Sequence, residues 1–171
     1  KNSFLPEVIA EVTEVSTDFM KGNEINIEAL LELDPDVVFY SADNKEEYDM
    51  LTNAGLIAVG FSTSNDSFNC IETLNSWLGQ LSTIFGKTDK VDGIVEYGNE
   101  VYARVQDKVK DLTDEEKPRV LILFHYGDGI IKTSGSNFFG QFWIESTGGI
   151  NVAADLKGQV EISMEQIYEW N

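Results

Sequence analysis

Two residues near position 125 have side chains suited to binding chemistry. His125 and Tyr126 follow the apolar run "RVLILFH" at residues 119–125 and precede the turn sequence "GDG". A neutral imidazole is a common metal ligand, and a tyrosine ring can lie against a partly apolar ligand while its hydroxyl donates a hydrogen bond. A position where a strand runs into a loop favours function, but a packing role for the same pair stays open.

The chain offers few residues for other catalytic chemistry. It contains one histidine and one cysteine, so neither a histidine-rich zinc site nor a Cys-His nucleophile can form within it. Cys70 stands in a helical pattern, where we expect a small buried hydrophobe. The sequence has no GxGxxG after a strand, no Walker phosphate loop and no GxSxG elbow. We expect no cofactor, no metal centre and no enzyme, with an α/β enzyme domain whose cofactor loop lies outside this sequence as the alternative.

The charge excludes one large class of partner. Thirty acidic residues face 12 basic ones, which gives a net charge of -18. A nucleic-acid-binding surface is basic, so we expect no nucleic acid as a partner, and a basic membrane-docking patch is disfavoured. No apolar run approaches the roughly 20 residues that span a bilayer. The simplest interpretation of most acids is a well-solvated surface.

Strands and helices alternate in the first half of the chain. Residues 37–41 and 56–61 are apolar runs of strand length, and the segment "NKEEYDMLTNAG" between them predicts a helix that ends at Gly55. From 68 to 85 apolar residues recur three and four apart until Gly86, which predicts an amphipathic helix packed on the sheet. This order is typical of a parallel α/β unit.

A long helix leads into a second α/β unit. The periodic run at 88–112 predicts one helix, longer than a small α/β unit needs. Residues 119–125 and 130–135 then predict two strands, followed by a loop and a short helix that holds Phe138, Phe139, Phe142 and Trp143. The predicted organisation is 1–86 for part of an N-terminal lobe, 87–113 for a connecting helix and 114–171 for part of a C-terminal lobe.

Two short segments repeat the same chemical pattern. Residues 24–34, "EINIEALLELD", align with residues 161–171, "EISMEQIYEWN", so that Asn26 matches Ser163 and Glu28 matches Glu165. In both copies an N-cap residue precedes an apolar residue, a glutamate and an amphipathic helix, and Ser163 with Gln166 forms a capping-box pattern. The repeat predicts equivalent helix starts in two homologous lobes.

The order of these motifs resembles the helical-backbone class (class III) of substrate-binding proteins of ABC importers. The first half carries "NIEALLELDPDVVFYS", "GLIAVGF" and "LGQLSTIFGKTDKVD". The second half, with "KPRVLILFHYGDG", "GSNFFGQFWIESTGGINVAAD" and "ISMEQIYEWN", is similar to the iron-complex and cobalamin branch. The resemblance implies an α/β fold of two Rossmann-like lobes joined by one long backbone helix. Since family members are much longer, it also implies a middle fragment in which each lobe is incomplete.

The resemblance implies a function outside the cytoplasm, in the periplasm or on a lipid anchor. The protein would capture a siderophore-bound iron, haem or cobalamin in the cleft between its lobes and deliver it to an ABC permease dimer. A sensor domain that kept the fold and lost transport is the alternative. Only Arg104 and Arg119 could form arginine forks, and neither is expected at the cleft, so a large, partly apolar chelate is favoured over an anionic catecholate.

The same resemblance assigns site residues. Clefts of this kind are lined by the carboxyl ends of strands and the starts of helices. The expected ligand contacts are Ser41, Ala42, Asp43 and Phe61 in the first lobe, and His125, Tyr126, Ser136, Asn137, Phe138 and Trp143 in the second. Phe139 and Phe142 are expected in the core. Glu28 and Glu165 match the paired glutamates that dock on the permease, and a favourable charge at a helix start is the alternative for both.

Overall fold

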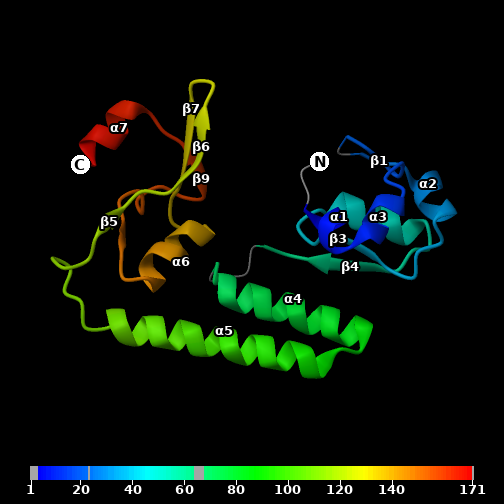
Figure 1. Cartoon of the computed structure of the whole chain (residues 1–171). Coiled ribbons are helices and arrows are strands. Elements are labelled where there is room, and N and C mark those ends of the chain that lie inside the picture. Colours follow the sequence, from blue (N-terminus) through cyan, green and yellow to red (C-terminus); the bar gives the residue numbers. More distant parts are fainter. Residues whose placement is uncertain (1–3, 23, 64–67, 171) are drawn as a thin grey trace. The chain divides into compact units, whose positions relative to one another are not determined.

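The computed structural model describes residues 4–22, 24–63 and 68–170, and Figure 1 shows the course of the chain. The chain divides into two compact units, Lys1–Phe61 and Ser62–Asn171. The sequence placed the end of the first lobe at residue 86, whereas the helix before that point packs with the second unit. The lobe boundary of the whole protein stays a prediction.

The first unit is built around one parallel pair of strands with a helix between them. Strands β3 and β4 pair in parallel, with Val38 opposite Ala58 and Ser41 opposite Phe61. Helix α3 (Lys45–Asn53), which lies between these two strands in the sequence, buries Leu51 completely. The elements of this unit are α1 (Leu5–Val8), the 3-10 helix η1 (Ala10–Glu14), β1 (Met20–Lys21), β2 (Glu24–Ile25), α2 (Ile27–Glu32), β3 (Val38–Ser41), α3 (Lys45–Asn53) and β4 (Ala58–Phe61).

The predicted helix between these strands begins and ends where its caps require. The side chain of Asn44 accepts a hydrogen bond from the Glu47 N–H at 3.1 Å, which satisfies one free donor of the first turn of α3. After the helix, Gly55 adopts a left-handed φ of 81°. Glycine has no Cβ and adopts this conformation without strain. The strand–helix–strand prediction for this unit is therefore confirmed.

The second unit begins with a helical hairpin. Helix α4 (Cys70–Phe85) is capped by Asn69 and ends at Gly86, which has φ 64°. Helix α5 (Thr88–Val109) follows, and the amide of Asn75 donates to the side chain of Asn99 between the two helices. The predicted end at residue 112 is three residues late, because residues 110–112 form a turn.

Two small sheets complete the second unit. Strand β5 (Arg119–Val120) pairs in parallel with β8 (Ile150–Asn151), whereas β6, β7 and β9 form an antiparallel sheet in that order. Four side chains form its buried apolar core: Ile131, Ile144, Ala153 and Ile162. The remaining elements are β6 (Leu123–Gly127), β7 (Ile130–Ser134), α6 (Phe139–Ser146), β9 (Gln159–Glu161) and α7 (Met164–Glu169).

The sequence prediction of a single strand over residues 119–125 is wrong. That run is divided between β5 and β6, which lie in different sheets. The division falls at Leu121 and Ile122, and the carbonyl of Ile122 accepts a hydrogen bond from the Thr133 hydroxyl at 2.8 Å. Because the run is apolar without interruption, its pattern does not reveal where the chain changes sheets.

Strands β6 and β7 form a tight hairpin. The two residues between them, Asp128 and Gly129, both have positive φ, at 53° and 77°. Two positive φ angles are the property of a type I′ turn, whose twist matches that of the flanking strands.

Of the helices in residues 4–22, 24–63 and 68–170, none combines the length and the apolar character that a membrane span requires.

Candidate functional site

The four residues predicted for the first lobe lie together at the carboxyl ends of β3 and β4. Ser41 is the register partner of Phe61, and the Ala42 N–H donates to the Phe61 carbonyl at 3.1 Å. Asp43 is exposed and comes just before Asn44, the N-cap of α3. The strand ends and the helix start therefore converge as the sequence predicted.

A pocket of about 440 Å³ opens beside these strand ends. Ser41 and Phe61 contribute to its wall, and the rings of Phe39 and Phe61 meet edge to face at 5.3 Å. Among the described residues, Glu47 is the one charged residue of the lining. The described lining residues are Phe19, Met20, Ile25, Leu30, Val38, Phe39, Tyr40, Ser41, Glu47 and Phe61. Such a wall suits an apolar or aromatic group rather than a bare ion.

In the second unit four rings form an aromatic cluster of Phe124, Phe138, Phe139 and Trp143. Phe138 and Phe139 lie 4.3 Å apart, Phe124 meets both edge to face at 5.4 and 5.2 Å, and Phe139 meets Trp143 at 4.8 Å. Trp143 remains 46% exposed, so the cluster presents one indole to solvent. The structure thus brings together two predicted ligand residues, Phe138 and Trp143.

Phe124 and Phe139 were not among the predicted ligand contacts. Phe124 belongs to β6, whose edge-to-face contacts support the start of α6. The hairpin sequence Asp128-Gly129 was the available signal for Phe124, because it fixes β6 as a hairpin strand. Phe139 has ring neighbours on three sides, in agreement with the packing role expected for it.

The loop before α6 holds Ser136 and Asn137. The Ser136 hydroxyl donates to the Leu156 carbonyl at 2.8 Å, and the Ser136 backbone bonds to the same segment. Asn137 is exposed and has a positive φ of 57°. Ser136 thus anchors the loop, and Asn137 turns the chain into Phe138, the N-cap residue of α6.

His125 and Tyr126 lie within β6 and not after its end, which corrects the sequence placement. The strand continues to Gly127, because the hairpin turn begins only at Asp128. His125 Nε2 lies 3.2 Å from the Gly127 carbonyl, and Tyr126 is 73% exposed. If Nε2 carries the proton, it donates to this carbonyl and Nδ1 keeps a free lone pair. Both side chains are accessible from solvent on the hairpin.

The repeated segments form the same local structure in both units. Helices α2 and α7 have six residues each, and Glu28 and Glu165 are their second residues. Asn26 accepts from the Ala29 N–H at 3.3 Å, and Ser163 accepts from the Gln166 N–H at 3.2 Å. Both glutamates are exposed. The predicted pair of equivalent helix starts is confirmed.

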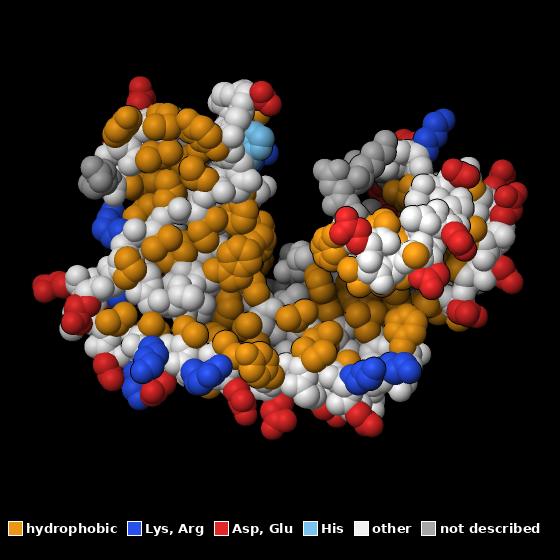
Figure 2. Space-filling view, in the orientation of Figure 1, with side chains coloured by type: hydrophobic (Ala, Val, Ile, Leu, Met, Phe, Trp, Pro, Cys, Tyr) orange, Lys and Arg blue, Asp and Glu red, His pale blue; other side chains and the backbone are white. Residues whose placement is uncertain are grey.

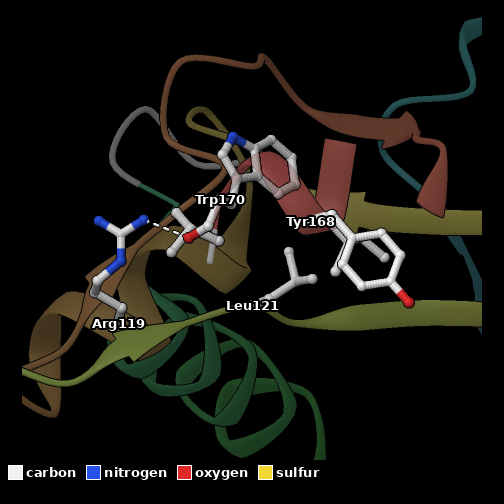
Figure 3. Close-up of a pocket in the computed structure, with 6 residues that line it drawn as sticks. Arg119, Leu121, Tyr168 and Trp170 are labelled. Atoms are coloured by element: carbon white, nitrogen blue, oxygen red, sulfur yellow. Dashed lines mark hydrogen bonds between the residues drawn. The ribbon is translucent and has the colours of Figure 1, made fainter. Parts of the chain in front are cut away.

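A pocket of about 480 Å³ lies between α7 and β5 (Figure 3). Figure 3 shows the rings of Tyr168 and Trp170 near Leu121, with the Arg119 guanidinium beside the backbone of Trp170. The Arg119 guanidinium donates to the Trp170 carbonyl at 2.6 Å, at the carboxyl end of α7. A cation at this helix end is favourable, so Arg119 holds α7 in place. Among the described residues, the lining includes none of the predicted ligand contacts.

Cys70 lies beside a smaller cavity of about 250 Å³ between α4, α5 and α6. It is half-buried, and the burial raises the pKa of its thiol, while a hydrogen bond with Trp143 acts in the opposite direction. The prediction of a small hydrophobe is thus met only in part. Within the described part of the chain, no three acidic, histidine or cysteine side chains gather where a metal ion could be held.

The comparison with protein families identifies the relatives of this chain. A family model described as periplasmic binding protein matches residues 8–171. The chain belongs to the periplasmic binding protein family. A solved periplasmic solute-binding protein from Veillonella parvula superposes on 98% of the chain and 49% of its own length, with 26% identity and a TM-score of 0.77.

The similar proteins whose names state a ligand differ in what they bind. The chain is 24% identical to the molybdate-binding protein MolA of Haemophilus influenzae, over 87% of this chain and 46% of that protein. It is 30% identical to a cobalamin-binding protein of Halobacterium salinarum, over 78% of this chain and 34% of that protein. The haem-binding protein HutB of Vibrio cholerae shares the fold, with a TM-score of 0.68 at 19% identity over 86% of the chain and 55% of that protein.

The chain spans less than half the length of the curated relatives that it matches, 46% and 34% of their residues. The resemblance inferred from the motifs is confirmed by the family match. The α/β fold class is confirmed as well. These relatives are solute-binding proteins rather than enzymes.

Proposed function

We propose that this protein is the substrate-binding component of an ABC importer and that it captures a bulky, partly apolar metal chelate, such as haem, cobalamin or a neutral ferric siderophore. The aromatic cluster, with Trp143 exposed at its edge, is the observation that carries this proposal. Flat aromatic side chains bind a large ring or a partly apolar chelate through area and stacking.

The scarcity of guanidinium groups supports this ligand class over an oxyanion or a catecholate. The chain has two arginines, and the one at β5 already donates to the Trp170 carbonyl. Recognition of carboxylates, phosphates and similar anions favours paired, bidentate arginines. The cobalamin-binding relative and the haem-binding neighbour take ligands of the proposed class, whereas the molybdate-binding relative supplies a competing candidate.

The proposed ligand contacts are those that the sequence predicted. They are Ser41, Ala42, Asp43 and Phe61 in the first unit, and His125, Tyr126, Asn137, Phe138 and Trp143 in the second, with Ser136 supporting its loop. A neutral imidazole at His125 could ligate the metal of a chelate through the ring nitrogen that does not face Gly127. The family implies an extracytoplasmic location, and attachment by a lipid anchor is part of the proposal.

The delivery step would use the two repeated helix starts. Glu28 and Glu165 stand at the same position of two equivalent helices. A permease dimer presents the same surface twice, so a binding protein that contacts both subunits needs the same charge twice. We propose that these two glutamates dock on basic side chains of the permease.

Titration of the full-length protein tests the ligand class. Tryptophan fluorescence would be followed with haemin, cobalamin, a neutral ferric hydroxamate, a ferric catecholate and molybdate as probes. We expect tight binding of at least one of the first three probes. Tight binding of only the catecholate or molybdate would contradict the proposal, and chemical conversion of a bound probe would favour the enzyme alternative.

Two matched variants locate the binding surface. Trp143→Leu should weaken binding of the accepted probe by about tenfold or more, equivalent to roughly 1.4 kcal/mol, because it removes the exposed ring of the aromatic cluster. Trp170→Leu removes an indole from the separate pocket of Figure 3 and should leave the affinity unchanged. The reverse result would place the ligand at the pocket of Figure 3.

Uptake of the ligand by cells that lack the protein distinguishes a transport role from a sensing role. Loss of uptake supports transport.

A further inference from the structure

A chain of hydrogen-bonded side chains connects the start of α6 to the interior of the second unit. Asn151 in β8 is 4% exposed, and its amide nitrogen donates to the Ser134 carbonyl at 3.0 Å and to Gln141 Oε1 at 2.6 Å. Its amide oxygen accepts from the Ala153 N–H at 3.0 Å. Gln141 lies in α6, and its own amide nitrogen donates to Glu145 Oε1 at 2.6 Å. This series of hydrogen bonds therefore joins β7, β8 and α6.

The partners at both ends fix the orientation of each amide. An ionised carboxylate only accepts hydrogen bonds, so Gln141 must turn its NH₂ group toward Glu145 and its oxygen toward Asn151. Asn151 must then offer its NH₂ group to Gln141, which the backbone carbonyl of Ser134 also requires. With each amide in one orientation, all of these bonds are made at once. The Asn151 end of the series is buried and the Glu145 end is exposed, and at the buried end satisfied polar groups specify a single packing.

The backbone approach at the same point is unusually close. A Cβ placed on Gly140, the residue before Gln141, would overlap the side chain of Ser134. Ser134 is fully buried in β7. Helix α6 thus lies against β7 at Gly140, and the hydrogen bonds of Asn151 secure that contact from β8, a strand of the other sheet of this unit. The residues on either side of this contact belong to the aromatic cluster: Phe138, Phe139 and Trp143.

We propose that Asn151 is a positioning residue for the ligand site, which acts through Gln141 to hold the start of α6 on β7 and so sets the position of the aromatic cluster. This inference rests on the proposed function in that the cluster is taken as the ligand surface. A binding group needs supporting residues that fix its position. In a finely positioned site a displacement near 1 Å can lower activity roughly a hundredfold.

The test compares two glutamine-to-methionine substitutions that remove hydrogen bonds at opposite ends of α6, one from within the helix and one from α5. Gln141→Met removes the bond to Asn151 at the start of the helix. Gln106→Met is the matched control, because the Gln106 amide donates to the Ser146 carbonyl at the end of the same helix. The measurement uses the full-length protein and the probe that binds it most tightly. We expect Gln141→Met to lower the affinity for this probe about tenfold or more, and Gln106→Met to change the affinity less than about twofold. Equal losses, or no loss in either variant, would overturn the proposal.

A pair of charge exchanges tests the orientation argument. Gln141→Glu places a carboxylate against Glu145 but keeps an acceptor for Asn151, so it should weaken binding of the probe less than Gln141→Met does. Adding Glu145→Gln restores the order of donors and acceptors, since the new amide donates to the new carboxylate, which still accepts from Asn151. We expect the double variant to regain affinity to within about threefold of the natural protein. Failure of this rescue, or a loss in Gln141→Glu as large as the loss in Gln141→Met, would contradict the assignment.

A readout without ligand separates this proposal from the proposed function. Fluorine NMR of the fluorotryptophan-labelled full-length protein, with the Trp143 signal assigned by its loss in Trp143→Phe, reports the order of α6 directly. Broadening or splitting of that signal in Gln141→Met but not in Gln106→Met supports the positioning role even if no probe binds the natural protein. An unchanged Trp143 signal in both variants would refute it.

Discussion

Replacing Gly140 with alanine should destabilise the protein, although alanine is the better helix former. Gly140 is the second residue of α6, and a Cβ at this position would lie 2.5 Å from the Ser134 Cβ and closer still to its hydroxyl. Real Cβ atoms do not come this close, and Ser134 is fully buried within β7. Either the helix or the strand must move, because the Ser134 Cβ is attached to the backbone and cannot rotate out of the way.

The expected magnitude follows from two opposing terms. Overpacking in a well-packed interior costs about 1–3 kcal/mol, while alanine gains at most about 1 kcal/mol over glycine from helix propensity. The gain is smaller near a helix start, so we expect Gly140→Ala to lower the free energy of unfolding by about 1–2 kcal/mol. Gly79, within α4, is the matched control, since a Cβ there would meet no described atom within 4 Å. Gly79→Ala should raise the free energy of unfolding by up to about 1 kcal/mol.

Urea unfolding of the full-length variants measures both effects. The comparison uses the transition midpoint at an unchanged slope, since a changed slope would indicate altered cooperativity between parts of the protein. We expect midpoint shifts of opposite sign for Gly140→Ala and Gly79→Ala. A Gly140→Ala protein as stable as the natural one would refute the close contact between α6 and β7.

Two further predictions concern Glu28 with Glu165, and Cys70. Replacing both glutamates with alanine should abolish uptake by cells while leaving ligand affinity unchanged, and intact uptake would reduce them to charges at helix starts. Because burial raises the pKa of the Cys70 thiol, its alkylation rate should still be rising with pH above the usual thiol value of about 8.5, and a plateau below that value would contradict the burial. Burial favours the neutral thiol in the folded protein. Its contribution to the free energy of unfolding is therefore present below the pKa of the unfolded state and is lost as pH rises through the pKa of the folded state.

Much of the helical structure could be predicted from the sequence because local chemistry determines it. Asn44 and Asn69 cap the helices that follow them, and Gly86 ends α4 in a left-handed conformation. The repeated helix starts were recognisable for the same reason, since Asn26 and Ser163 form the same cap from different letters. Caps involve residues at most four apart, so a short stretch of sequence contains the whole interaction.

Strand pairing in the second unit was not predictable in the same way. The apolar run from Arg119 satisfies two sheets in succession, and the parallel order inferred by analogy with the first unit concealed the antiparallel hairpin. The sequence Asp128-Gly129 contained the missing information, because that dipeptide between apolar runs is the strongest short-range signal for a hairpin. Because of this error, the sequence prediction placed His125 and Tyr126 at a strand end, whereas they lie within β6.

For the candidate site too, contacts between neighbouring elements could be predicted from the sequence, whereas contacts across the fold could not. Ser41 and Phe61 could be placed together from sequence, because two parallel strands joined by one helix bring their carboxyl ends to one edge. The aromatic cluster and the chain from Ser134 to Glu145 could not, since they join β6, β7, β8 and α6 across the fold. Asn151 reads in sequence as an ordinary loop asparagine, and only its burial and its three bonds identify it.

The two units repeat their helix starts but not their strand ends, and this contrast bears on the proposed transport function. The β3 and β4 ends carry small and polar residues with Phe61, whereas the second unit offers the aromatic cluster beside a hairpin. A ligand without internal symmetry demands no repetition of its contacts, but a permease dimer of two like subunits demands the same contact twice. A charge that served only its own helix could be placed at any residue of the first turn. The shared position of Glu28 and Glu165 behind different caps is therefore the feature that supports the proposed docking on one repeated partner.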